Sequence, residues 1–395
     1  MLNTPFSPWP SFTEEEIDAV SGVLRSNQVN YWTGEQGRQF EQEFAQFSDC
    51  KYAVAVANGT LALDLAFQVL NISKGDEVIV TSRTFIASIS SIINAGAIPV
   101  FADVELDSQN ISADTINAVL TPKTKAIVCV HLAGWPCEMD DIMTLAKQHN
   151  LLVIEDCAQA HGAKYKGRSV GSIGHIGAWS FCQDKIMTTG GEGGMLTTND
   201  ETLWRQAWAY KDHGKSYAAV YETQHPPGYR WLHESFGSNW RLTEMQAAIG
   251  RIQLKRMTEW TAKRQENAAR IVAVCRNYSW LSVPELPKHV KHANYKLYIN
   301  LKIELLPSNW SRDGIIAAIT AQGVPCYPGS CSEVYREKAF DNTPFRPIRP
   351  LVNAQKLGES SLMFLVHPTL TDAEMTKTRA VIEHVFAEID KNVNL

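Results

Sequence analysis

Residues 125–156, KAIVCVHLAGWPCEMDDIMTLAKQHNLLVIED, contain the pattern that decides the fold. Two short apolar runs, KAIVCVH (from Lys125) and LLVIED (from Leu151), flank the segment EMDDIMTLAKQHN, whose apolar residues recur at three- and four-residue spacing. Short apolar runs are typical of buried strands, and the spacing between them is typical of an amphipathic helix. The stretch therefore predicts a strand, a crossover helix and a second, parallel strand.

Strand and helix patterns alternate in the same way upstream of this unit. The other predicted strands are YAVAVA (from Tyr52), EVIVTS (from Glu77) and IPVFAD (from Ile98), and the predicted helices between them are TLALDLAFQVL and IASISSIINAG. Repeated units of this kind indicate an α/β fold with a mostly parallel central sheet flanked by helices. Ligands of such sheets bind beyond the carboxyl ends of the strands, so the residues after each apolar run are the candidate site residues.

The pattern changes after about residue 250. A long helical segment, LTEMQAAIGRIQLKRMTEWTAKRQENAARIVAVCRN, is followed by a short strand pattern, YKLYINLKIEL, a Pro-rich stretch, TPFRPIRPL, and a final amphipathic helix beginning near Asp372. We interpret these residues as a smaller C-terminal α+β domain. The expected division is a large domain over residues 10–255 and a small domain over residues 256–395, with residues 1–9 extended.

Composition argues against several classes of function. The net charge of -5 and the absence of a Lys or Arg run give no reason to expect a nucleic-acid partner. No basic region followed by an apolar one begins the chain, and no apolar stretch approaches the length of a bilayer span, so we expect a cytoplasmic protein without a membrane partner. The eight cysteines and 11 histidines show no zinc spacing, so we expect free thiols and no metal site.

Two residues after predicted strands could carry chemistry together. Asp156 ends LLVIED, where an acidic residue alone is more often a helix cap. Lys185 follows the predicted strand end at Ser180-Phe181 in GAWSFCQDKIMTTGGEGG, and a lone loop lysine is usually only solvated. The combination suits pyridoxal 5′-phosphate (PLP), because a partly desolvated lysine can form an imine near neutral pH and a carboxylate can pair with the protonated pyridine nitrogen.

A third candidate lies after the first predicted strand. Asn58, Gly59 and Thr60 follow YAVAVA and open a predicted helix. Small residues at a helix N-terminus expose backbone N–H groups and the positive end of the helix dipole, which suits a phosphate. Asn-Gly-Thr is also an ordinary turn and N-cap, so this motif is weak on its own.

Further motifs occur in order along nearly the whole chain. They begin with EEEIDAVSGVLRSNQVNYWTGEQGRQFEQEFA and end with FGSNWRLTEMQAAIGRIQL, with KGDEVIVTSRTFIAS, GAIPVFADVE, TKAIVCVHLAGWPCEMDDI and VIEDCAQAHGAKYKGRSVGSIGHIGAWSF between them. Through these motifs the chain resembles the DegT/DnrJ/EryC1/StrS family of PLP-dependent sugar aminotransferases. The resemblance implies the fold-type I aminotransferase fold.

The resemblance also implies a role for each matching residue. Lys185 would bind PLP as a Schiff base and later move a proton between substrate and cofactor, and its presence argues against the dehydratase branch, where a His replaces it. Asp156 would bind the pyridine nitrogen. The other implied cofactor contacts are Gln159 at the ring or its phenolic oxygen, Phe85 stacked on the ring, Gly59, Thr60 and Ser180 at the phosphate, and Asn239 at the phosphate from the neighbouring subunit. Arg241 is the candidate for the amino donor's carboxylate.

The function that the resemblance implies is transfer of an amino group from L-glutamate to a keto group of a nucleotide-linked sugar. This reaction would serve surface polysaccharide or amino-sugar biosynthesis, in a homodimer with shared active sites. Two alternatives stay open. One is a transaminase that acts on a cyclitol or another keto compound, and the other is a catalytically silent PLP-binding regulator.

The chain departs from the family pattern next to the cofactor lysine. Cys182, Gln183 and Asp184 stand where an aromatic residue or His followed by a small residue is commoner.

The irregular segment from Val324 to Pro350 is our candidate for nucleotide contacts. Aromatic rings could stack on a base and guanidinium groups could bind a diphosphate, and the candidate residues are Tyr327, Tyr335, Arg346 and Arg349. A mobile surface loop is equally compatible with this segment.

Overall fold

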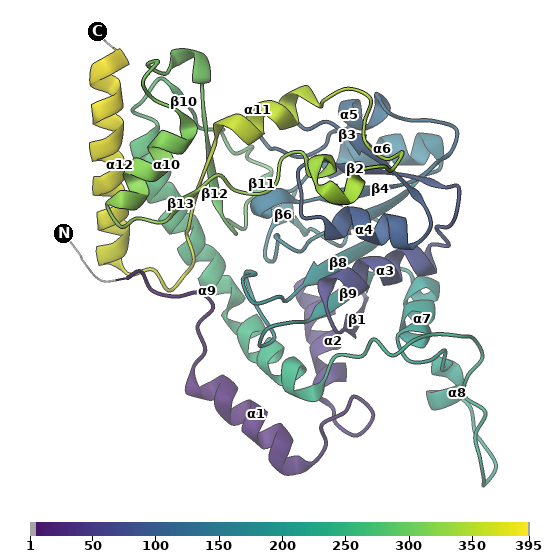
Figure 1. The fold of residues 1–395 in the computed structure, drawn as a ribbon. Helices are drawn as coiled ribbons and strands as arrows, with labels where there is room; N and C mark the ends of the chain where they lie inside the picture. Colours follow the sequence, from purple (N-terminus) through teal and green to yellow (C-terminus); the bar gives the residue numbers. More distant parts are fainter. Residues whose placement is uncertain (1–4, 394–395) are drawn as a thin grey trace.

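A computed structural model describes residues 5–393 of the chain. Its central sheet has seven strands in the order β1-β9-β8-β5-β4-β2-β3, with helices around it (Figure 1). The sheet strands are β1 (Tyr52–Val56), β2 (Glu77–Thr81), β3 (Ile98–Ala102), β4 (Thr124–Val130), β5 (Leu152–Asp156), β8 (Ile176–Ser180) and β9 (Gly194–Thr198). The helices of this part are α1 (Glu14–Ser26), α2 (Gln36–Phe47), α3 (Gly59–Val69), α4 (Ala87–Asn94), α5 (Ala113–Asn117), η1 (Leu132–Gly134), α6 (Met139–His149), α7 (Glu201–Tyr210) and α8 (Tyr217–Tyr221).

The central sheet is mostly parallel, which confirms the predicted fold class. Strands β3, β2, β4, β5 and β8 pair in parallel, and β9 pairs antiparallel with both β8 and β1. Successive residues of β2 enter different cores, because Val78 and Val80 pack on one face of the sheet and Ile79 packs on the other. A strand that is buried on both faces must be apolar at every position, which explains the uninterrupted apolar runs.

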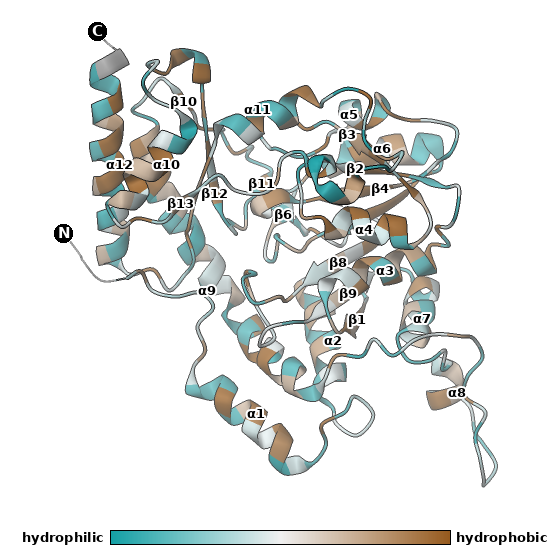
Figure 2. Cartoon of the chain, viewed as in Figure 1, coloured by the Kyte–Doolittle hydropathy of each residue, from teal (hydrophilic) through white to brown (hydrophobic). Residues whose placement is uncertain are grey.

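The helices turn a polar side outward. In Figure 2 the strands β2 and β4 are largely brown, whereas the surrounding helices carry teal residues on their outer sides. The helix α6 begins at Met139 and ends at His149, and it connects β4 to β5 as the sequence predicts. None of the helices within residues 5–393 combines the length and the apolar character needed to cross a bilayer.

A smaller unit follows the long helix α9 (Glu244–Cys275). Its four-stranded antiparallel sheet has the order β10-β12-β14-β13. A three-stranded sheet, β11-β6-β7, joins β11 of this unit to two short strands that lie between β5 and β8 in the sequence. The strands are β6 (Lys164–Tyr165), β7 (Arg168–Ser169), β10 (Leu281–Ser282), β11 (Val290–Lys291), β12 (Leu297–Leu301), β13 (Cys326–Tyr327) and β14 (Ser361–Phe364). The helices are η2 (Ile303–Leu305), α10 (Arg312–Ala321), η3 (Val334–Arg336), η4 (Lys338–Phe340), α11 (Val352–Ser360) and α12 (Asp372–Val393).

The proposed boundary between the two domains falls inside α9, so one continuous helix belongs to both. A separate hydrophobic core, formed by residues between 268 and 389, lies between α9, α10, α12 and the four-stranded sheet. Of the segment expected to be extended, residues 1–4 lie outside the described residues, and residues 5–8 are in neither helix nor strand. The division into domains stays a proposal.

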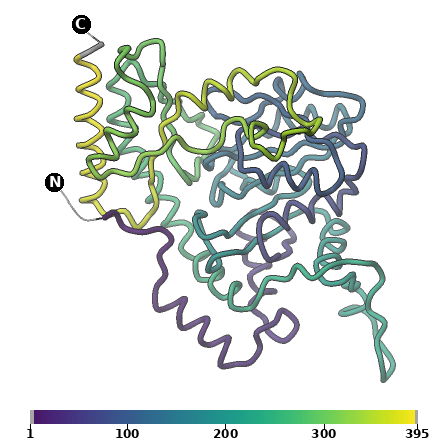
Figure 3. Tube along the Cα trace, viewed as in Figure 1, coloured from purple at the N-terminus to yellow at the C-terminus, as the bar shows by residue number. Residues whose placement is uncertain are grey.

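The irregular segment near residue 335 returns to the large core instead of forming a free loop. Figure 3 shows the chain near residue 350 running beside the part of the chain that holds β2 and β3. Val334, Tyr335 and Phe340 belong to the same core cluster as β2, and the Tyr335 ring lies 5.5 Å from the Phe101 ring. Tyr335 is buried, so the expectation that it stacks on a base is wrong: packing already covers its ring.

The burial of Tyr335 predicts a loss of stability when its ring is removed. Tyr335→Ala should lower the free energy of unfolding by about 3 kcal/mol, because a large aromatic side chain leaves a cavity. Tyr335→Phe keeps the ring and loses only its hydroxyl contacts with Glu333 and the backbone of Leu351, so it should cost about 1 kcal/mol. Urea unfolding measures both, and equal stability of Tyr335→Ala and the wild type would contradict the core assignment.

Candidate active site

The carboxyl ends of the parallel strands surround a cavity of about 610 Å³. Its walls come from the segments that follow β1, β2, β5 and β8, together with the last residue of β4. Parallel strands end at the same edge of a sheet, so residues far apart in the sequence meet there. Seven of the predicted site residues line this cavity: Gly59, Thr60, Phe85, Asp156, Gln159, Ser180 and Lys185.

Asp156 places a buried carboxylate at the end of β5. Its side chain accepts hydrogen bonds from Ser88 Oγ at 2.8 Å and from the backbone N–H of Ala158 at 3.1 Å. Burial raises the pKa of Asp156, although these two hydrogen bonds and the charge of Lys185 act in the opposite direction. A cationic ligand atom in the cavity would favour the ionised carboxylate, so the site suits a protonated ring nitrogen.

Lys185 sits on the turn that follows β8, and 17% of its side chain is exposed. Its backbone N–H donates to the carbonyl of Cys182 at 3.0 Å, and its carbonyl accepts from Trp9 Nε1 at 2.8 Å. The Nζ atom lies 3.9 Å from Asp184 Oδ1 and 5.4 Å from the centroid of the Tyr295 ring. The main chain of the lysine is therefore held by hydrogen bonds at its N–H and at its carbonyl, and the residue lines the cavity.

The N-terminus of α3 forms a narrow cradle beside Ser180. Asn58 caps the helix, because its Oδ1 accepts from the N–H of Leu61 at 2.9 Å. A Cβ on Gly59 would lie 2.5 Å from the Cβ of Ser180, so only glycine allows this approach. Backbone N–H groups at a helix start, next to the hydroxyls of Thr60 and Ser180, form a donor set that suits a phosphate.

Gln159 and Phe85 provide a polar and an apolar face of the cavity. Gln159 Oε1 accepts from the N–H of Ala133 at 2.8 Å, which fixes the carboxamide and leaves its NH2 group as the donor for a ligand. Phe85 is 68% exposed although it is a large apolar residue. An open aromatic face in a cavity is suited to stacking on a planar ring. With the phosphate cradle and the buried carboxylate, the described residues fit PLP.

Asn239 and Arg241 do not line this cavity. Asn239 is exposed and pairs through its backbone with Asp212 in an isolated bridge. Arg241 Nη1 donates to Asp212 Oδ1 at 2.6 Å, and Asp212 is fully buried. The structure thus separates these two residues from the other seven, and it shows the guanidinium of Arg241 engaged in an ion pair within its own chain.

Several residues near the lysine were not identified from the sequence. Ser88 lies four residues after Thr84 in TSRTFIAS, so its position near Asp156 could have been found from the motif. Trp9 and Tyr295 contact the lysine segment from 176 and 111 residues away, and no sequence pattern indicates such contacts.

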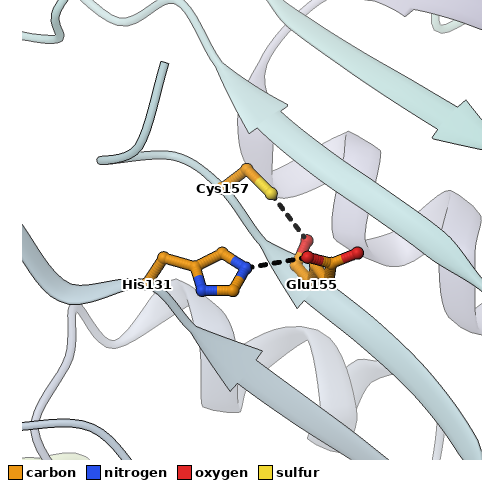
Figure 4. A group of neighbouring side chains, drawn as sticks. All are labelled: His131, Glu155 and Cys157. Atoms are coloured by element: carbon orange, nitrogen blue, oxygen red, sulfur yellow. Dashed lines mark hydrogen bonds and ion pairs between the residues drawn. The ribbon is translucent and has the colours of Figure 1, made fainter. Parts of the chain in front are cut away.

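Behind the cavity, His131, Glu155 and Cys157 form the one group of metal-ligand side chains that lie close together within residues 5–393 (Figure 4). Their ligand atoms are engaged in hydrogen bonds. Glu155 accepts from His131 Nε2 and from the backbone N–H groups of residues 171, 173 and 174, and His131 Nδ1 accepts from the N–H of Cys137. We interpret the group as a structural network. All eight cysteines lie within the described residues and are free thiols there.

Comparisons with known proteins agree with this geometry. The model of the DegT/DnrJ/EryC1/StrS aminotransferase family matches residues 10–385. The chain is 36% identical to the GDP-perosamine synthase of Caulobacter vibrioides, over 90% of this chain and 92% of the relative. It is 34% identical to the L-glutamine:2-deoxy-scyllo-inosose aminotransferase of Streptomyces kanamyceticus, over 82% and 77%.

Among solved structures, the aminotransferase from Psychrobacter cryohalolentis superimposes with a TM-score of 0.97 at 68% identity, covering 98% of this chain and all of the other. The fold-type I architecture, the enzyme class and the cofactor PLP are therefore those that the sequence predicts. The chain belongs to the DegT/DnrJ/EryC1/StrS aminotransferase family.

Proposed function

We propose that the protein transfers an amino group from L-glutamate to a keto group of a nucleotide-linked sugar, for the synthesis of an amino sugar used in a surface polysaccharide. The observation that carries this proposal is the cavity in which Lys185 and Asp156 lie together beside the α3 cradle. The similarity to a GDP-perosamine synthase over most of both chains supports a nucleotide-linked sugar as acceptor.

Each cavity residue has a distinct role in this proposal. PLP, when bound, supplies an aldehyde that can be attached to an amine and a ring that accepts electrons. Lys185 would hold the cofactor covalently, and Asp156 would pair with the ring nitrogen. The remaining contacts would be Phe85 on the ring face, Gln159 at the ring edge, and Gly59, Thr60 and Ser180 at the phosphate.

Lys185 has a second role once its nitrogen is free. Its Nζ would take a proton from the carbon that carries the amino group of the donor and deliver it to the cofactor. The two hydrogen bonds that hold the main chain of Lys185 limit the positions that Nζ can take, which favours proton transfer over a short distance. In the second half-reaction the same atom would work in reverse on the keto sugar.

We also propose a homodimer in which each active site receives Asn239 from the partner chain. Asn239 is exposed and lies outside the cavity of its own chain. The preceding loop projects from the body of the molecule after α8 (Figure 1), and it carries Tyr229, Trp231 and Phe236, each more than 70% exposed. Large exposed aromatic side chains on a projecting loop are typical of a surface that another protein covers.

Of the four candidate nucleotide contacts, we keep Tyr327 and Arg349 in the proposal. Arg346 donates to the carbonyl of Tyr335 at 3.0 Å and to the carboxylate of Asp341 at 2.5 Å, so it stabilises its own loop. Arg349 is exposed and has no ion-pair partner within residues 5–393, and Tyr327 is 45% exposed. An exposed guanidinium can bind a diphosphate, and an exposed ring can stack on a base.

A second candidate function is amino transfer to a cyclitol ketone. The similarity to an enzyme named for 2-deoxy-scyllo-inosose favours it, because that compound has no nucleotide. A screen of GDP- and UDP-linked keto sugars against cyclitol ketones, read by mass spectrometry, separates the two functions. A catalytically silent PLP-binding regulator would release no aminated product from any of them and would not convert PLP to its amine form in the presence of glutamate.

The first functional prediction concerns the cofactor residues. Lys185→Ala should abolish the visible absorption band of the covalently held cofactor and lower the amino-transfer rate by about a thousandfold or more. Asp156→Asn should still bind PLP but react about a hundredfold more slowly, because the ring nitrogen loses its charge partner. Circular dichroism should show both variants folded. Normal turnover in Lys185→Ala would mean that another lysine carries the cofactor.

The second prediction tests the shared site. Neither Lys185→Ala nor Asn239→Ala should be active alone. An equal mixture that exchanges subunits should regain about a quarter of the wild-type activity, because half of the dimers are hybrids and each hybrid has one site without either change. Light scattering should show a dimer. A fully active monomer, or mixtures that stay inactive despite proven exchange, would contradict the shared site.

The third prediction tests the nucleotide contact. Arg349→Ala should raise the KM for the nucleotide sugar about tenfold, which corresponds to the loss of one charged hydrogen bond. The half-reaction with glutamate, followed by the loss of the visible band, should stay unchanged. Arg379→Ala, which removes an exposed arginine of α12, is the matched control and should behave as the wild type. Equal damage to both half-reactions by Arg349→Ala would indicate a structural role instead.

A further inference from the structure

Lys185 is preceded by an acidic residue that faces the same nitrogen. Asp184 Oδ1 lies 3.9 Å from Lys185 Nζ, and both residues line the cavity. Among the ion pairs of residues 5–393, this is the one that Lys185 makes. The charge of Asp184 is therefore directed at the atom that would react with the cofactor.

Tyr295, from the C-terminal part of the chain, holds this carboxylate in place. Its phenolic O–H donates to Asp184 Oδ2, which leaves Oδ1 for the lysine. Burial acts to raise the pKa of Asp184, but the charge of Lys185 and the hydrogen bond from Tyr295 outweigh it and keep that pKa below its usual value. Asp184 is thus ionised at neutral pH.

The other charged groups near Asp184 and Lys185 do not take over the role of the Asp184 carboxylate. Asp156 is hydrogen-bonded to Ser88 and Ala158, on the β5 side of the cavity. Lys296 is mostly buried nearby, and burial lowers its pKa to about 8, against the opposing influence of Asp184. The titratable groups that act on Asp184 or Lys185 from the surrounding elements are Asp156, His161, Cys182, Tyr295 and Lys296. His161 is neutral at neutral pH, because burial lowers its pKa to about 3, so Lys296 is the one group of this set that can add positive charge beside Lys185.

We propose that Asp184 is a positioning residue for Lys185, whose Oδ1 orients Nζ toward the cavity and stabilises the positive charge of this nitrogen whenever it carries a proton. The inference rests on the proposed role of Lys185 as the cofactor lysine. The nitrogen must be protonated in some steps and unprotonated in others, so a carboxylate beside it affects each gain and loss of the proton. Because Tyr295 belongs to the C-terminal part of the chain and holds Asp184 by a hydrogen bond, the packing of that part also affects the position of the carboxylate.

The sign of the effect follows from charge. Asp184 Oδ1, 3.9 Å from the nitrogen, favours its protonated form, so removal of this anion must disfavour that form. In full-length Asp184→Asn loaded with PLP, the pH midpoint of the change in the visible absorption band should fall by about one unit. The control Asp313→Asn removes an exposed carboxylate of α10 and should leave the midpoint unchanged. An unchanged midpoint in Asp184→Asn would overturn the proposal.

Two further variants separate charge from packing. Asp184→Glu keeps the charge and should restore the midpoint toward that of the wild type. Tyr295→Phe keeps the ring but releases the carboxylate, so it should shift the midpoint in the same direction as Asp184→Asn, by a smaller amount. If Asp184→Glu shifts the midpoint as far as Asp184→Asn does, the carboxylate has only a packing role and the inference is wrong.

A measurement without the cofactor keeps the test independent of the proposed function. In protein stripped of PLP, acetylation of Lys185 by acetic anhydride, followed by peptide mass spectrometry, reports the fraction of neutral amine. At neutral pH this acetylation should be several times faster in Asp184→Asn than in the wild type, and equal rates would overturn the inference. If Lys185→Ala keeps the visible band, the proposed cofactor role fails. If that variant loses the band but Asp184→Asn matches the wild type in both readouts, only the role of Asp184 fails.

Discussion

Two adjacent carboxylates end strand β5, and they meet opposite surroundings because neighbouring residues of a strand face opposite sides of the sheet. Glu155 accepts four hydrogen bonds from His131 and three backbone N–H groups, which lower its pKa despite burial. Asp156 faces the cavity with two hydrogen bonds, and burial raises its pKa. The hydrogen bonds of Glu155 hold the end of β5 in place. Asp156 is therefore kept in a fixed position in the cavity, where it can pair with a cationic group of a ligand.

The rest of the site depends on that fixed strand end. Strand β5 pairs with β4 and β8, so the segment carrying Lys185 leaves the sheet beside Asp156. Gly59 brings the start of α3 against Ser180 at the end of the same β8 strand. Segments from outside the sheet then complete the lysine environment, because Trp9 binds the carbonyl of Lys185 and Tyr295 binds Asp184. The proposed chemistry thus depends on a fixed sheet edge and on contacts from residues far away in the sequence, Trp9 and Tyr295.

Much of this site could be predicted from local patterns, because parallel strands bring their carboxyl ends together. Apolar runs located the strands, and the residues after them, such as Gly59, Asp156 and Lys185, do line one cavity. Contacts of long sequence separation have no such periodic signal, so the roles of Trp9 and Tyr295 could not be predicted. The expectation for Tyr335 failed because composition alone does not distinguish an aromatic ring in a loop that packs on the core from one that is free for a ligand.

The central claim is that PLP is attached to Lys185, opposite Asp156. Reduction of the purified, PLP-loaded protein with borohydride fixes the cofactor on the lysine that holds it, and peptide mass spectrometry then identifies that residue. The account predicts the added cofactor mass on the peptide that contains Lys185 and on no other. The same mass on Lys296, which is largely buried and lies near Asp184, would contradict the account directly.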